Sequence, residues 1–213
     1  MACRFACRQA PLYPAAFDAY LRASEAWQSR HDTAKDVPVA IAAYTEAIRL
    51  DPNYALALAG RSYALSTQAA EEATEAAIRE GFAKAENDAR QALELAPQLA
   101  EAHMALANVF EIGTLDFARA REEYEQALAL APGNAQVLRV SAEFAAYMGH
   151  FDTAIEAARR AVVLDPLARY THTILGRALY AARRYGEAAA AHAEVISLAP
   201  DFKAAYAERG FAF

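Results

Sequence analysis

The chain has 213 residues, of which 58 are alanine, 8 are glycine and 8 are proline. Alanine has the highest helix propensity of all residues, and a chain that is 56% hydrophobic and 23% charged is too apolar to be disordered. The net charge of −6 is spread along the sequence, which disfavours binding to nucleic-acid phosphates. We therefore predict a soluble all-α protein that binds no nucleic acid.

Residues 1–14 are expected to form an N-terminal extension or linker before one domain over residues 15–213. Cys3 and Cys7 lie in this extension, without a Cys or His pair at the spacing of a zinc site. No apolar run reaches the roughly 18 residues of a membrane helix, and the first residues lack the apolar core of a signal peptide. We expect no metal site, no membrane insertion and a cytoplasmic location, or a periplasmic one if a parent protein carries a membrane anchor.

A Leu-x-Pro element recurs along the chain and defines a repeat. Its prolines are Pro52, Pro97, Pro132, Pro166 and Pro200, at intervals of 45, 35, 34 and 34 residues. A period near 34 in a helical composition indicates stacked helical hairpins, because a unit of this size cannot bury its own apolar face. Proline ends the second helix of each hairpin and begins the turn to the next one.

Small residues recur in register with these prolines. Twelve residues before each proline stand Ala40, Ala85, Ala120, Ala154 and Ala188, and ten residues after each stand Ser62, Ala107, Ala142, Gly176 and Gly210. We expect these two sets to face each other and to let paired helices approach closely. A larger residue fifteen positions before each proline should open the second helix: Val37, Phe82, Phe117, Phe151 and Tyr185.

The segments YTEAIRLDPNYALALAGRSYAL and HTILGRALYAARRYGEAAAAHAEVISLAP resemble the tetratricopeptide repeat (TPR) family. The resemblance covers the chain from about Ala15 to Phe213. It implies a right-handed α-solenoid of about five helical hairpins, which end near the five prolines, and a last single helix from about Phe202. We thus expect eleven helices.

The interval of 45 residues holds an insertion at residues 66–81, inside the second hairpin. This segment is rich in Ala and Glu and should be helical, so that it lengthens the hairpin. Two interpretations remain open: a solvated extension, or a protruding acidic surface that contacts another domain or subunit.

The TPR resemblance also places a ligand surface on the first helix of each hairpin, which lines the concave face in that family. The positions implied are 4, 7, 11, 14 and 15 residues after each proline. Candidate partner-binding residues at these positions are Tyr63, Glu101, Asn108, Glu111, Arg139, Glu143, Tyr147, Tyr170, Arg177 and Tyr180. Tyr and Arg are enriched in binding hot spots, which favours a protein or peptide ligand, although such a tyrosine can equally pack against the next hairpin.

The order of the repeats is similar to the TPR region that follows the output domain of bacterial class III adenylate cyclases and of winged-helix transcriptional activators. This resemblance implies a regulatory region of a bacterial signalling protein. The alternative is a stand-alone adaptor that associates with itself, because Phe211 and Phe213 leave apolar rings uncovered at the end of the sequence. In that case the chain forms a homodimer.

Catalytic motifs are missing from the sequence: the five histidines are scattered, and no HExxH, GxSxG, P-loop or GxGxxG occurs. We therefore predict no catalytic residues, no cofactor and a protein that is not an enzyme.

Overall fold

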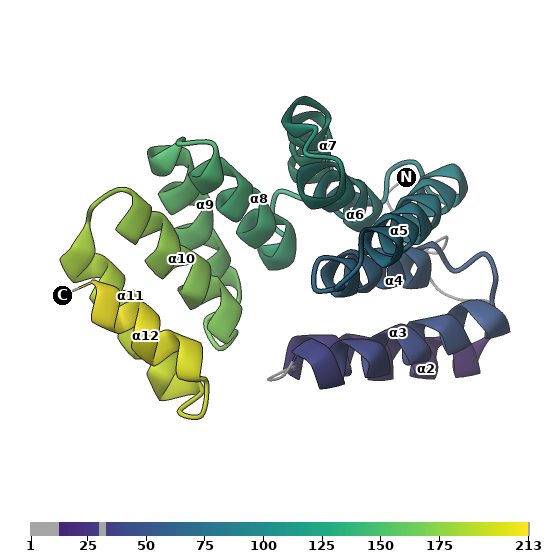
Figure 1. The fold of residues 1–213 in the computed structure, drawn as a ribbon, viewed down its shortest axis with the longest axis horizontal. Helices are drawn as coiled ribbons and strands as arrows, with labels where there is room; N and C mark the ends of the chain where they lie inside the picture. Colours follow the sequence, from purple (N-terminus) through teal and green to yellow (C-terminus); the bar gives the residue numbers. More distant parts are fainter. Residues whose placement is uncertain (1–12, 30–32, 213) are drawn as a thin grey trace. The chain divides into compact units, whose positions relative to one another are not determined.

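The computed structural model describes residues 13–29 and 33–212. These residues form helices and connecting turns without a β-strand, which confirms the all-α prediction (Figure 1). The eleven α-helices are α2 (Pro14–Ser29), α3 (Thr33–Leu50), α4 (Ala55–Ala69), α5 (Glu75–Leu95), α6 (Ala100–Asn108), α7 (Phe117–Leu130), α8 (Ala135–Tyr147), α9 (Phe151–Leu164), α10 (Arg169–Ala181), α11 (Tyr185–Leu198) and α12 (Lys203–Phe211). Cys3, Cys7, His31 and Phe213 lie outside the described residues.

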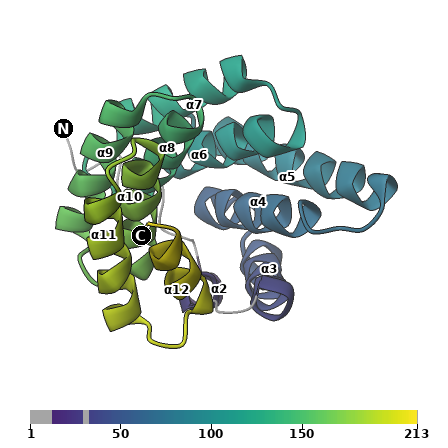
Figure 2. The same cartoon turned by 60° about the vertical axis from the view of Figure 1, so that its left-hand side comes forward.

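Successive helices pack in pairs as five hairpins: α2 with α3, α4 with α5, α6 with α7, α8 with α9, and α10 with α11. The single helix α12 packs against α11. This arrangement confirms the α-solenoid of helical hairpins with a terminal single helix. The chain divides into two compact units, residues 1–130 and 131–213, and the helices of the second unit are seen together in Figure 2.

The small residues lie where the repeat places them. Ala40, Ala85, Ala120, Ala154 and Ala188 are all fully buried. Ser62, Ala107, Ala142 and Gly176 are buried as well, whereas Gly210 is exposed on α12, which no second helix follows in the described part of the chain. Alanine therefore determines the close contact between paired helices.

The larger residues fifteen positions before each proline open the second helix in three hairpins. Phe117, Phe151 and Tyr185 are the first residues of α7, α9 and α11, and all three stay exposed at the hairpin end. Val37 and Phe82 differ, because both are buried inside longer second helices.

The insertion in the second hairpin lengthens mainly its second helix. α5 has 21 residues where α9 has 14, and α4 has 15 where α8 has 13. Thr74 caps the longer helix, because its hydroxyl oxygen accepts a hydrogen bond from the amide of Ala77 at 3.3 Å. Exposed pairs of opposite charge follow along the same helix, at Glu75 with Arg79 and Glu80 with Lys84.

The interval of 35 residues between Pro97 and Pro132 also has a structural cause. Phe117 comes 20 residues after Pro97, whereas Phe151 comes 19 residues after Pro132. The extra residue is taken up by a π-helical turn, η1 (Val109–Gly113), at the end of α6. A π-helical turn holds more residues than an α-helical turn, so later side chains are rotated about the helix axis.

Candidate protein-interaction surface

The candidate residues of the first unit contribute mostly to packing. Tyr63 on α4 is half-buried, and its ring meets the edge of Trp27 with 5.5 Å between ring centroids. Glu101 on α6 is half-buried near Tyr20. Burial raises the pKa of Tyr20, and the charge of Glu101 raises it further.

Asn108 and Glu111 are buried, with 8% of each residue exposed. Glu111 accepts a hydrogen bond of 2.7 Å from the hydroxyl of Tyr124 on α7. Glu111 lies within the π-helical turn η1. Glu111 therefore belongs to the contact between the two helices of the third hairpin, and we do not retain it as a ligand-binding residue.

In the second unit α10 packs against α8, and polar side chains join α10 to α8 and to α12. Arg177 on α10 donates from Nε and Nη2 to Glu208 Oε1 on α12, at 2.9 and 2.7 Å. Its Nη1 donates to Glu143 Oε1 on α8 at 3.3 Å. The hydroxyl of Tyr147 donates to the same carboxylate oxygen at 3.2 Å. One guanidinium thus joins three helices.

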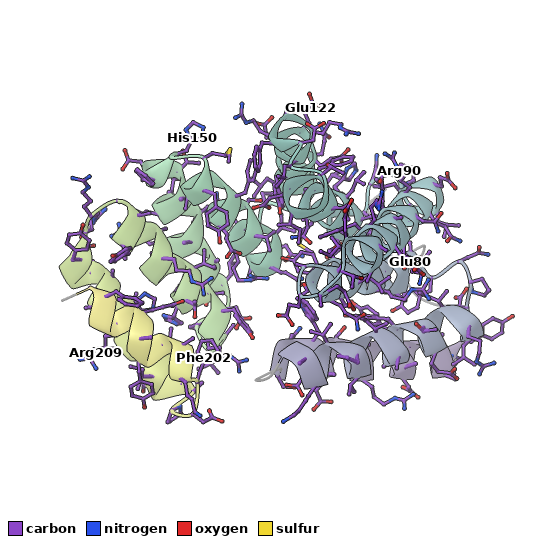
Figure 3. The ribbon with its side chains drawn as sticks, viewed as in Figure 1. Glu80, Arg90, Glu122, His150, Phe202 and Arg209 are labelled. Atoms are coloured by element: carbon purple, nitrogen blue, oxygen red, sulfur yellow. The ribbon has the colours of Figure 1, made fainter. Side chains whose placement is uncertain are left out.

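A cluster of arginine and aromatic side chains lies near the N-terminal ends of α8, α10 and α12. The guanidinium of Arg169 is 4.5 Å from the ring centroid of Tyr170 and 5.0 Å from that of Phe202, which precedes α12 and is labelled in Figure 3. The two rings meet edge to face with 6.3 Å between centroids. Arg139 on α8 lies 5.9 Å from the Tyr170 ring centroid. These contacts combine edge-to-face aromatic packing with cation–π attraction.

We call this surface the α8–α10–α12 strip. It consists of Arg139, Glu143, Tyr147, Arg169, Tyr170, Arg177, Phe202 and Glu208. Tyr180 is exposed at the end of α10, where its ring lies against Tyr185 with 5.4 Å between centroids. Of the residues predicted in the second unit, the structure therefore brings Arg139, Glu143, Tyr147, Tyr170 and Arg177 together, and it places Tyr180 at the hairpin turn.

A protein-family model described as tetratricopeptide repeat matches residues 142–201, which include most of this strip. No curated protein matches the sequence.

Solved structures of helical repeat proteins are similar to this chain in fold. TTC0263, a TPR protein of Thermus thermophilus, has a TM-score of 0.69 at 16% identity and covers 93% of this chain and 98% of its own. YrrB, described as a TPR protein with an unusual peptide-binding site, has a TM-score of 0.54 at 16% identity, with 92% of each chain covered. Human IFIT1, solved as a dimer with m7Gppp-AAAA, has a TM-score of 0.71 at 19% identity, over 91% of this chain and 46% of its own. At these identities the likeness shows the fold.

Phe211 follows Glu208 on α12. Phe211 stands eleven residues after Pro200, as Arg177 does after Pro166 and Glu143 after Pro132. It is 72% exposed and lies one turn beyond Glu208 on α12. The sequence alone suggests Phe211 only as an association surface, because it shows α12 as an unpaired end.

Sequence reasoning missed Arg169, Phe202 and Glu208. They stand three, two and eight residues after their prolines, outside the five positions that the TPR resemblance implies. Arg169 directly precedes Tyr170, and Phe202 and Glu208 belong to the segment after Pro200, so the five register positions alone did not identify them. Among the described residues, no group of three or more His, Cys, Asp or Glu side chains is placed to hold a metal, and none of the helices is long and apolar enough to cross a bilayer.

Proposed function

We propose that the chain is a non-catalytic protein-interaction module that binds a peptide segment of a partner along the α8–α10–α12 strip. The observation that carries the proposal is the joining of three first helices by Arg177, which holds Glu143 and Glu208 in one row. A row of side chains that are already ordered loses little further entropy when a ligand binds. The fold likeness to YrrB, a TPR protein with a peptide-binding site, supports a peptide as the ligand.

A peptide suits this strip better than a nucleic acid, even though IFIT1 shares the fold. Binding a phosphate backbone needs a row of cations that are open to the ligand, whereas Arg177 in the middle of the strip is neutralised by two glutamates. The acidic net charge of −6 also opposes a polyanion.

We further propose that this module is the regulatory region of a bacterial signalling protein, as the sequence order resembles the TPR region of class III adenylate cyclases. A cytoplasmic location fits that role, and a periplasmic one fits a parent protein with a membrane anchor.

The alternative proposal is a self-associating adaptor in which the exposed Phe211 forms a homodimer contact. Sedimentation equilibrium separates the two, because the adaptor gives a dimer that Phe211→Ser dissociates and the module gives a monomer.

Peptide binding is tested by selecting a random-peptide library displayed on phage against the chain. Selected peptides are then titrated against the wild type, the R139Q/R177Q double variant and the control R160Q. Arg160 is on α9 and donates to the carbonyl of Pro132, away from the strip. We expect the double variant to weaken binding at least about tenfold and R160Q to leave it unchanged. Equal binding by all three proteins contradicts the proposed site.

A further inference from the structure

Arg139 differs from the other arginines of the strip in its partners. Arg177 is held by two carboxylates, and Arg169 lies over two aromatic rings and donates to the hydroxyl of Tyr170 at 2.9 Å. Arg139 is half-buried and lies near the Tyr170 ring, but it has no carboxylate partner among the described residues. A guanidinium near an aromatic ring keeps its donor edge open to a planar carboxylate. Arg139 can therefore accept an external acid without breaking an internal ion pair.

Phe211 supplies a different kind of contact on α12. Its ring is 72% exposed, and the small residues Ala204 and Ala207 are exposed on the same helix at i−7 and i−4. Small neighbours leave the ring open to a large apolar side chain. An aromatic residue with this exposure gains free energy when a second ring or an aliphatic side chain covers it.

The charge in the middle of the strip determines where a carboxylate of the ligand can bind. Glu143, Arg177 and Glu208 together carry a net charge of −1, so this part repels a second carboxylate. The Arg139 end, with Arg169 nearby on α10, is positive. Charge complementarity therefore favours binding of the ligand's acidic group at Arg139 on α8. An apolar group of the ligand is then left to contact α12.

We infer that the ligand is a peptide with an aspartate or glutamate that pairs with Arg139 and a phenylalanine-like side chain that covers Phe211. This inference rests on the proposed function and names the ligand chemistry of the same strip. The two contacts lie on helices two steps apart in the strip, and neighbouring helices are roughly 8–10 Å apart. An extended peptide rises by about 3.3 Å per residue, so the acid and the ring should be about five or six residues apart.

The test uses blocked, fluorescein-labelled peptides with one Asp and one Phe in a Ser/Ala background, titrated by fluorescence anisotropy. One peptide has Asp and Phe five residues apart. The controls replace Asp by Asn, replace Phe by Ala, or place the two residues two apart. A labelled single-stranded RNA of similar length is measured in parallel. The proteins are the wild type, R139Q, F211A, and the matched controls R160Q and L167A, since Leu167 is 79% exposed in the turn before α10.

We expect the wild type to bind the first peptide at least about tenfold more tightly than each control peptide. R139Q should lose the preference for Asp and keep that for Phe, and F211A should do the reverse, while R160Q and L167A keep both. Equal binding of the control peptides, or tighter binding of the RNA, overturns the inference. If phage-selected peptides still depend on the strip in that case, the proposed function stands and only the ligand chemistry is wrong. If they do not, the proposed function fails too.

Discussion

Nδ1 of His192 on α11 lies 3.4 Å from Oε2 of Glu208 on α12, and both atoms are buried without a hydrogen-bond partner among the described residues. The other carboxylate oxygen of Glu208 is held by Arg177 on α10. The His192 ring is 1% exposed and lies directly behind the α8–α10–α12 strip. A titratable group is thus packed against the carboxylate that ties α12 to the strip.

The free energy of unfolding should depend on this histidine in acid. Burial lowers the pKa of His192 below its ordinary value of about 6.5, while Glu208 favours its protonated form and Arg177 opposes it. The unfolded chain then takes up a proton near pH 6.5 before the folded chain does, so stability falls as the pH drops below 6.5. An NMR titration should give a midpoint below 6.5 for His192, and H192Q should lose less stability between pH 7 and pH 5. A midpoint above 6.5 contradicts this assignment.

His103 should show the opposite dependence. Its Nδ1 is 2.6 Å from Glu123 Oε2, and its Nε2 is 3.1 Å from the carbonyl oxygen of Pro97. The hydrogen bond to Glu123 raises the pKa of His103, so its stabilising contribution is complete below pH 6.5 and is lost as the pH rises through the raised value. Denaturant unfolding should show that H103Q destabilises the chain more at pH 5.5 than at pH 8.5. Equal costs at both pH values would show that the pair does not titrate in this range.

Gly176 is required by the contact between α10 and α11. A Cβ atom at this position would lie 2.6 Å from atoms of the His192 ring. Gly176→Ala should therefore destabilise the chain by about 1–3 kcal/mol, because the buried ring must shift to make room for the added methyl group. The matched control is Gly186→Ala in α11, where an added Cβ meets no atom within 4 Å. Better helix propensity should make that variant more stable by about 0.5–1 kcal/mol, as thermal melts can show.

The positions of the buried small residues could be predicted from the sequence, because only small side chains fit between paired helices. Ala154 and Ala188 are fully buried where the proline spacing places them, since a larger residue there would separate paired helices. The π-helical turn that contains Glu111 could not be predicted, because one extra residue can enter a loop or a π-helical turn, and only packing decides between them. The bond from Arg177 to Glu208 joins residues 31 positions apart and depends on how α12 packs, which no local pattern encodes.

Arg177→Ala should loosen α12 without unfolding the hairpins. The side chain of Arg177 is 45% exposed, so its ion pairs contribute only about 0–1 kcal/mol to global stability. They nevertheless link α10 to α12, which otherwise packs mainly against α11 in the described part of the chain. Hydrogen exchange should rise in residues 203–211 and stay constant in α8–α10. The control R159A breaks an exposed pair with Glu187 and should leave α12 protected; equal loosening by both variants would refute the link.

The ion pair between Arg61 on α4 and Asp88 on α5 gives the largest predicted single effect. Arg61 Nε and Nη2 donate to the two carboxylate oxygens of Asp88 at 2.7 and 2.8 Å, and Asp88 is only 3% exposed. Asp88→Leu leaves the guanidinium in a half-buried site without its acid, so we expect a cost of about 2–4 kcal/mol.

Replacing both partners should cost less than replacing Asp88 alone. The double variant R61L/D88L leaves no unpaired charge between α4 and α5, and leucine fills part of the volume of either side chain. The surface pair of Glu86 and Arg90 on the same helix is the control, because E86A should cost less than about 1 kcal/mol. Urea unfolding of the wild type, both single variants and the double variant gives the coupling energy between Arg61 and Asp88. A double variant less stable than D88L would mean that the guanidinium packs with its neighbours independently of its charge.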